Sequence, residues 1–207
     1  MQSLLDGLIR FRKQDFEEHK SLFNKLKSFQ EPHTLFIACS DSRVVPDLIT
    51  KTLPGELFVI RNIANLVPPY RETKEYVATT SGIEYAINIL KVKNIVVCGH
   101  SNCGGCASMY LPNEVLDEIP HTKKWLELAH SVKERALKEL EGNDENIKEW
   151  LTEQINIIEQ MKHLLTYPTI KDKFNKKEIN IYGWYYIIET GEVFIFNNEK
   201  REFELAN

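Results

Sequence analysis

The sequence predicts an α/β fold in which a mainly parallel central β-sheet is flanked by helices. Short apolar runs rich in β-branched residues alternate along the chain with longer segments whose apolar residues recur at helical spacing. Alternation of this kind is typical of a parallel sheet with right-handed crossovers. Two further features complete the prediction. They are an N-terminal helical arm and a C-terminal β-hairpin, turning around Thr190 and Gly191, that extends the sheet.

The arm occupies residues 1–30. From residue 2 to residue 28, leucine, isoleucine and phenylalanine recur at helical spacing between charged residues, which predicts one or two amphipathic helices ending before Pro32. Their apolar face would pack either on the chain's own sheet or on a partner, and the pattern does not separate these possibilities. Residues 1–207, arm included, are expected to form one domain.

The body of the chain is punctuated by prolines and glycines. Pro46 suits the first position of a short helix, and Pro54-Gly55 marks a turn. The expected elements are strands at 34–38, 56–60 and 95–97, helices at 47–50, 79–90 and 122–166 with a break near residue 142, a loop at 64–76, and hairpin strands at 179–188 and 192–196.

Composition narrows the classes of function. The formal net charge is −4 and no basic stripe stands out, which argues against a nucleic-acid partner. No segment reaches the ~18–20 continuous apolar residues that span a membrane, and the N-terminus lacks the features of a secretory signal. We therefore expect a cytoplasmic protein. In that reducing compartment, four cysteines, three of them between positions 98 and 106, indicate metal or redox chemistry rather than disulfides.

A predicted strand within residues 94–106 leads directly into metal-ligand residues. Gly99 ends its apolar run, and His100 and Cys103 follow. Cys39 ends the first predicted strand in the same way. Because the carboxyl ends of parallel strands meet at one edge of a sheet, we predict that these two cysteines and the histidine bind one zinc ion. Three protein ligands leave one zinc position open for water, as in catalytic zinc sites.

A second interpretation uses the same stretch differently. Cys103-Gly-Gly-Cys106 has the spacing of a dithiol redox motif placed between a strand and a helix. That interpretation leaves Cys39 and His100 without a role. We therefore expect Cys98 and Cys106 to be structural thiols, and keep a dithiol redox protein as an alternative.

Asp41 and Arg43 lie close to the predicted ligand Cys39. Left unpaired, Asp41 could bind zinc as a fourth ligand and close the site. Paired with Arg43 through two charge-assisted hydrogen bonds, it would instead accept a hydrogen bond from zinc-bound water. A third possibility is that Asp41 only caps the turn that follows it.

Four motifs in order connect the region from about Gln30 to Cys106 with a known family. They are Cys39-Ser-Asp-Ser-Arg43, Pro54-Gly-Glu56, Arg61-Asn-Ile-Ala-Asn65 and His100-Ser-Asn-Cys-Gly104. Each motif alone is weak, but together they are specific, and the chain resembles the β-class carbonic anhydrases, as a bacterial member with a plant-like active-site pocket. This resemblance implies reversible hydration of CO2 to bicarbonate and a proton by a zinc-bound hydroxide. It also implies a homodimer or homotetramer with the active site near the subunit interface.

The resemblance assigns roles to individual residues. It places zinc on Cys39, His100 and Cys103 and a catalytic pair on Asp41 and Arg43, with Asp41 as a fourth ligand only in a closed state. The substrate pocket that it implies, partly supplied by the neighbouring subunit, comprises Gln30, Phe58, Ile63, Tyr85 and the backbone amide of Gly104.

One departure concerns regulation. Some family members are inhibited by bicarbonate bound beside a tryptophan, a position that is Phe36 here, and Ala38 replaces the usual glycine before the first cysteine. Arg61 and Tyr186 match other members of that regulatory site. Without the indole donor we expect the open form with three protein ligands. A related zinc hydrolase acting on a CO2-like molecule such as CS2 stays an alternative for the same site.

Overall fold

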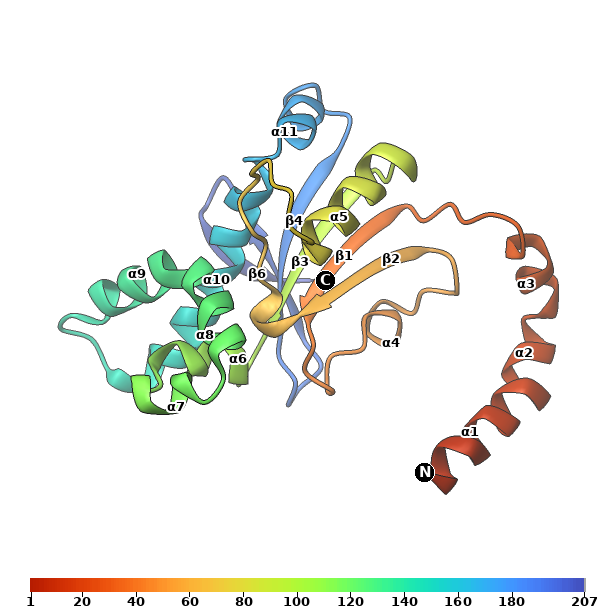
Figure 1. Ribbon diagram of the computed structural model, residues 1–207, viewed down its shortest axis with the longest axis horizontal. Coiled ribbons are helices and arrows are strands. Elements are labelled where there is room, and N and C mark those ends of the chain that lie inside the picture. Colours follow the sequence, from red (N-terminus) through yellow and green to blue (C-terminus); the bar gives the residue numbers. More distant parts are fainter. Residues whose placement is uncertain (207) are drawn as a thin grey trace.

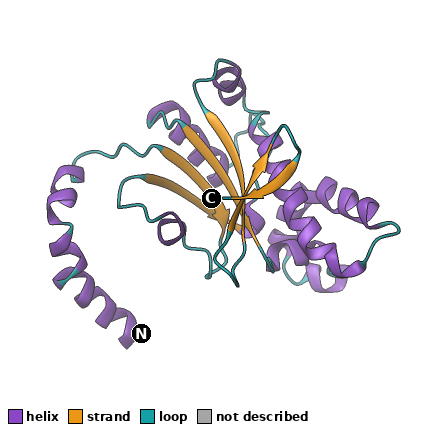
Figure 2. Ribbon diagram, turned by 180° about the vertical axis from the view of Figure 1, so that it is seen from behind, coloured by secondary structure: helices purple, strands orange, loops and turns teal. Residues whose placement is uncertain are grey.

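The computed structural model describes residues 1–206, and a six-stranded sheet lies at its centre (Figures 1 and 2). Its strand order is β2-β1-β3-β4-β5-β6. The first four strands pair in parallel, whereas β5 and β6 are antiparallel to their neighbours. The strands are β1 (Thr34–Cys39), β2 (Leu57–Asn62), β3 (Asn94–His100), β4 (Asn180–Tyr186), β5 (Val193–Asn197) and β6 (Glu202–Leu205). The predicted α/β class and mainly parallel sheet are confirmed, and β6 is an addition to the predicted hairpin.

Helices precede β1 and fill the segments that connect β1, β2, β3 and β4. They are α1 (Gln2–Lys13), α2 (Asp15–Glu18), α3 (Lys20–Leu26), α4 (Pro46–Thr50), α5 (Ala78–Glu84), α6 (Gly104–Ala107), α7 (Asn113–Asp117), α8 (Pro120–Leu126), α9 (His130–Leu140), α10 (Lys148–Leu164) and α11 (Pro168–Asn175). A π-helical turn, Tyr85–Ile89, continues α5. The sequence did not predict α7 or α11.

The two faces of the sheet are covered unequally. Leu35 and Ile37 of β1 point into a large apolar core with α5, α10 and α11. The alternate residues Phe36 and Ala38 point to the other face, into a smaller cluster with residues from α4 and the loop before it. Apolar side chains stay exposed on and around that second face, namely Leu48, Val59 and Tyr182. Parallel sheets are normally covered on both faces, so this face is incompletely packed.

Gly99 does not end the central strand, which corrects the prediction. β3 runs through Gly99 to His100, and all of its residues from Ile95 onward are buried. A Cβ atom added to Gly99 would lie 2.7 Å from Cγ1 of Ile157 in α10. The glycine therefore allows α10 to pack directly on the strand that carries His100.

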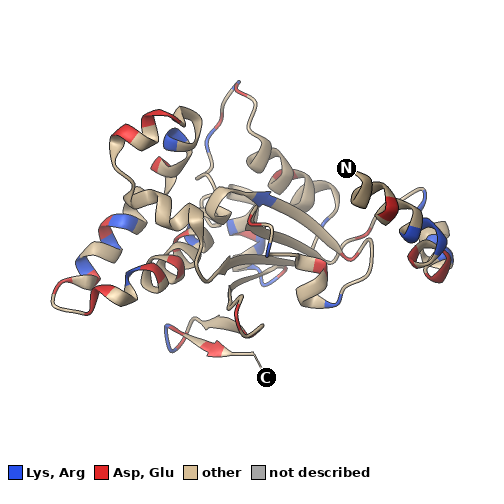
Figure 3. Cartoon of the chain, turned by 90° about the horizontal axis from the view of Figure 1, so that it is seen from below, with Lys and Arg blue, Asp and Glu red and all other residues tan. Residues whose placement is uncertain are grey.

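The N-terminal arm extends away from the sheet (Figure 1), and α1, α2 and α3 contain no buried residue. Leu4 and Leu8 are each about two-thirds exposed, at 68% and 65%. Acidic and basic residues are interspersed along the arm (Figure 3). Of the two predicted possibilities for the apolar face of the arm, packing on the chain's own sheet does not occur.

Across residues 1–206, every helix is either too short or too polar to cross a bilayer.

Candidate metal centre

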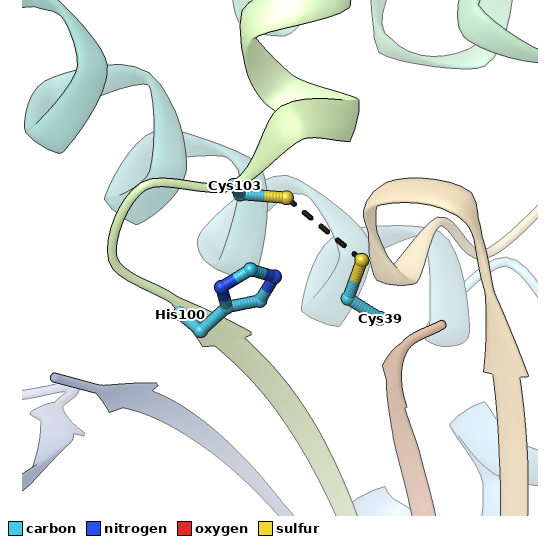
Figure 4. A group of neighbouring side chains, drawn as sticks. All are labelled: Cys39, His100 and Cys103. Atoms are coloured by element: carbon cyan, nitrogen blue, oxygen red, sulfur yellow. Dashed lines mark hydrogen bonds between the residues drawn. The ribbon is translucent and has the colours of Figure 1, made fainter. Parts of the chain in front are cut away.

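The carboxyl ends of β1 and β3 lie side by side and carry two of the predicted ligands. Ala38 of β1 pairs with Cys98 of β3 in parallel register, so Cys39 and His100, the last residues of their strands, lie at the same edge. The chain then turns into α6, and Cys103 is the residue before that helix. Figure 4 shows the imidazole and the two sulfur atoms facing one another. The predicted meeting of Cys39, His100 and Cys103 is therefore confirmed.

The three donor atoms have the spacing of a zinc site. All lie within 4.8 Å of one another, and the Sγ atoms of Cys39 and Cys103 are 3.9 Å apart. Tetrahedral zinc with Zn–S bonds of about 2.3 Å would hold two sulfur atoms about 3.8 Å apart. All three side chains are buried, with exposures of 4% or less. Two thiols and an imidazole in this arrangement therefore fit a zinc ion.

His100 supplies an independent indication of a metal. Its Nδ1 lies 3.0 Å from the carbonyl oxygen of Ser101, which places the proton on Nδ1 and leaves a lone pair on Nε2. That Nε2 atom is buried and has no hydrogen-bond partner within the described chain. An unsatisfied buried polar atom costs about 1–3 kcal/mol. A bound cation would satisfy it.

The two cysteine thiols also respond to their mutual contact. The hydrogen-bonding contact of its thiol with Cys103, followed by burial, raises the pKa of Cys39 to about 12. The pKa of Cys103 is raised as well, chiefly by its hydrogen bond with Cys106. Zinc binds thiolates, so its binding must displace these protons. Zinc uptake by this site is therefore coupled to proton release.

Asp41 and Arg43 form a two-pronged ion pair beside the ligands. Arg43 donates from Nε to Oδ1 at 2.9 Å and from Nη2 to Oδ2 at 2.7 Å, which is the paired arrangement among the three that the sequence left open. This guanidinium holds the pKa of the Asp41 carboxyl far below its usual range. Oδ2 of Asp41 is 3.9 Å from Nε2 of His100. The carboxylate is therefore ionised, turned onto Arg43, and close to the position that a metal would occupy.

Arg43 also connects the two loops of the site. Its Nη2 donates a second hydrogen bond, 3.0 Å long, to the carbonyl oxygen of Asn102, between His100 and Cys103. Asn102 has a left-handed backbone with φ of 54°. The side chain that orients Asp41 thus depends on the loop that carries the other two ligands.

Glu153 is a part of the site that the sequence analysis missed. This α10 residue is 3% exposed, and its Oε1 accepts a hydrogen bond of 2.7 Å from the backbone amide of Cys103. Its Oε2 accepts one of 2.6 Å from the hydroxyl of Tyr185. Burial raises the pKa of Glu153 to about 6. A sequence signal existed, because Glu153, Asn156 and Gln160 place polar groups at helical spacing on the buried side of α10.

The predicted pocket residues separate into two groups. Ile63 directly follows Asn62, which pairs with Cys39, and Gly104 directly follows Cys103, so both lie near the metal ligands. The other three lie toward the opposite end of the strands. Phe58 pairs with Leu35, four residues before Cys39, a separation of roughly 13 Å along a strand.

Tyr85 and Gln30 belong to the distant group. The ring of Tyr85 lies 6.0 Å from that of Phe58. Gln30 precedes the first residue of β1, so it is separated from Cys39 by the whole strand, roughly 17 Å. The chain continues outward from there toward the arm (Figure 1). One chain therefore does not bring Gln30, Phe58 and Tyr85 to its own metal ligands.

Cys98 and Cys106 lie behind the ligands. Both are buried, and the Sγ atom of Cys106 accepts a hydrogen bond of 3.7 Å from Nδ2 of Asn156. Asn156 also donates to the carbonyl oxygen of Ala64, so Cys106 is part of a polar contact between α10 and the loop after β2. The contact of Cys106 with Asn156 is that of a structural thiol, and it gives no support to the dithiol alternative.

Comparisons with known proteins agree with this geometry. A family model described as carbonic anhydrase matches residues 34–193. A carbonic anhydrase of Helicobacter pylori (strain J99) is 42% identical over 96% of this chain and 91% of its own length. A carbonic anhydrase of Synechocystis is 38% identical over 98% of this chain and 73% of its own length.

Solved structures show the same fold. The β-carbonic anhydrase CcaA superposes with a TM-score of 0.94 at 35% identity, covering 100% of this chain and 99% of that one. One of two tetrameric β-carbonic anhydrases from Sordaria macrospora gives a TM-score of 0.81 at 31% identity, covering 95% and 96%. Sequence, fold and donor set agree, and the chain belongs to the β-class carbonic anhydrases, the zinc enzymes that interconvert CO2 and bicarbonate.

Proposed function

We propose that Cys39, His100 and Cys103 hold the zinc at which this chain hydrates CO2, and that Asp41 and Arg43 direct the reaction. One observation carries this assignment. A three-donor site with an unsatisfied His100 Nε2 lies next to an ionised Asp41 that is held off the metal position by Arg43. That arrangement leaves one coordination position for water, as hydration requires.

The protein's own groups supply orientation and charge stabilisation. When bound, zinc supplies the Lewis acidity that makes water nucleophilic. Asp41, an acceptor at every working pH, receives a hydrogen bond from the attacking oxygen and thereby fixes its lone pair toward the substrate. The Gly104 amide donates a hydrogen bond where negative charge develops on the substrate oxygens. Ile63 forms part of the apolar wall.

We further infer that the working unit contains at least two copies of the chain, with each active site near their interface. Gln30, Phe58 and Tyr85 lie too far from their own metal ligands to complete that pocket, so a neighbouring copy would supply them. The exposed apolar face of the sheet and the unpacked arm support the same inference, because both need a partner surface. Tetramers among the structural relatives support oligomerisation without deciding between dimer and tetramer.

The chain boundaries and compartment are part of the proposal. Residues 1–207 would act as one domain, with residues 1–30 as an arm that packs on the partner. A cytoplasmic location suits the chemistry, since a reducing compartment keeps Cys39 and Cys103 available as zinc ligands.

Removal of a ligand cysteine tests the metal assignment. Cys39→Ala and Cys103→Ala should each lose bound zinc and CO2 hydration, because two protein donors do not hold the metal in a catalytic geometry. Cys106→Ser is the matched control and should keep both. Zinc per chain and stopped-flow CO2 hydration are measured on the same preparations. Full zinc occupancy with normal turnover in either ligand variant would contradict the assignment.

The pH dependence of catalysis tests the charge of the ligand set. Three neutral histidines let zinc bring a water pKa to about 7, but two thiolates cancel the 2+ charge and weaken that effect. The lowered pKa of Asp41 keeps its carboxylate ionised at every pH of the assay, so titration of Asp41 adds no step to the pH profile. We expect kcat/KM for CO2 hydration to keep rising between pH 7 and 9.5. A plateau reached by pH 6.5 would show that the ligand charges are wrong.

Complementation between two damaged chains tests the shared active site. Cys39→Ala removes the metal from one chain, and Gln30→Ala removes a pocket donor from the other. Each variant alone, as a homo-oligomer, should lose CO2 hydration activity by a factor on the order of 100. Co-expression with two affinity tags isolates the mixed oligomer. If pockets are shared between copies, mixing rebuilds one intact site from every two and restores about half of wild-type CO2 hydration. Mixed oligomers no more active than the Gln30→Ala protein would indicate that each pocket is formed within one chain.

A further inference from the structure

Arg61, the fifth residue of β2, hydrogen-bonds to the backbone of the loop that follows β1. Its Nε donates to the carbonyl oxygen of Cys39 at 3.1 Å, and its Nη2 donates to the carbonyl oxygen of Asp41 at 2.6 Å. Both acceptors belong to residues of the proposed site, one a metal ligand and the other the residue that orients the attacking oxygen. The Arg61 guanidinium therefore spans the short segment that leads from the metal to the catalytic carboxylate.

Asp41 is consequently held both at its side-chain carboxylate and at its backbone carbonyl group. Its carboxylate accepts hydrogen bonds from the Arg43 guanidinium and, at 3.0 Å, from the Arg43 backbone amide. Its carbonyl oxygen accepts from Arg61 and, at 3.0 Å, from the backbone amide of Val44. The Asp41 carboxylate stays paired with Arg43 only while the backbone of this loop keeps its path, because Arg43 lies two positions further along the same loop.

The Asp41 carboxylate lies only a short distance from the position of the metal. Its Oδ2 lies 3.9 Å from Nε2 of His100, the atom that faces the metal position. A modest rotation of the loop between Cys39 and Arg43 would bring the carboxylate into contact with the metal. Arg61 opposes that rotation because it ties the end of β1 at Cys39 and the loop at Asp41 to the neighbouring strand β2. A backbone hydrogen bond of 2.8 Å from the amide of Ser40 to the carbonyl oxygen of Asn62 lies between these two points.

We propose that Arg61 is a positioning residue that holds Asp41 off the metal and so keeps the fourth coordination position open. The proposal rests on the proposed function of the site and deepens it. It also gives Arg61 a different role from the regulatory anion contact that the sequence resemblance implies. Two of the donor groups of its guanidinium are occupied by loop carbonyls in this structure.

The test uses Arg61→Gln and Arg61→Lys, with Arg135→Gln as the matched control. Arg135 pairs with Glu139 on the surface of α9 and has no contact with the site among the contacts of the described chain. Each protein is loaded with Co²⁺ in place of zinc, and azide affinity is read from the visible spectrum of the metal. Azide needs an open coordination position, so its affinity measures how often Asp41 occupies that position.

Arg61→Gln should lower azide affinity and kcat by about 10-fold or more. The azide affinity and kcat of Arg61→Lys should lie between those of Arg61→Gln and the wild type, because its single ammonium group reaches the two carbonyl oxygens less well. Arg135→Gln should match the wild type. The decisive comparison repeats Arg61→Gln in an Asp41→Ala background. If Arg61 acts through Asp41, the substitution has little further effect on azide affinity there, since interacting residues are non-additive.

Two results would overturn the proposal. One is unchanged azide affinity in Arg61→Gln, and the other is an equal loss of affinity whether or not Asp41 is present. Metal content and thermal unfolding of every variant identify a protein that has simply failed to fold, in which case Arg61→Lys carries the comparison. Failure of the proposed function would look different, because the wild-type zinc enzyme itself would then show no CO2 hydration.

Discussion

The parallel pairing of β1 with β3 is the constraint on which the metal centre depends. Cys39 and His100 are far apart in sequence, yet each ends its strand at the same sheet edge because Ala38 lies opposite Cys98. A slip of one residue in this register would turn every side chain of the strand to the other face, and the thiol of Cys39 would leave the site. The apolar core on both sides of β1 fixes that register, so packing far from the metal determines whether a metal can bind.

Three charged side chains convert this edge into a rigid site. Arg43 joins Asp41 to the loop before Cys103, Arg61 joins the loop after Cys39 to β2, and Glu153 holds the amide of Cys103 from α10. Each of these three side chains hydrogen-bonds to backbone atoms, in addition to any role in catalysis. The ligands are thus pre-positioned by hydrogen bonds. Zinc binding, worth about 10–16 kcal/mol in small structural sites, would therefore meet a site that is largely formed.

The sequence was most informative where side-chain chemistry and local pattern agree. Buried apolar runs located β1 and β3, and the residues that end them identified the ligands. Gly99 was misinterpreted because a glycine that ends a strand and one that admits a helix look the same in sequence, and only the contact with Ile157 separates them. Glu153 was missed because its role depends on the packing of α10. The division of the pocket into near and distant residues likewise required the strand register. Nothing in the sequence around Gln30 and Phe58 indicates whether they line the pocket of their own chain or that of a partner.

The coordination of the native metal tests the central claim most directly. X-ray absorption at the zinc edge, recorded on the purified wild-type protein at neutral pH, counts the sulfur and light-atom neighbours of the metal. A site formed by Cys39, His100 and Cys103 with one open position predicts two sulfur atoms at about 2.3 Å and two nitrogen or oxygen atoms at about 2.0–2.1 Å. A shell of three or four sulfur atoms would bring Cys98 or Cys106 into the site and contradict the ligand set. A protein that binds no zinc would contradict the account altogether.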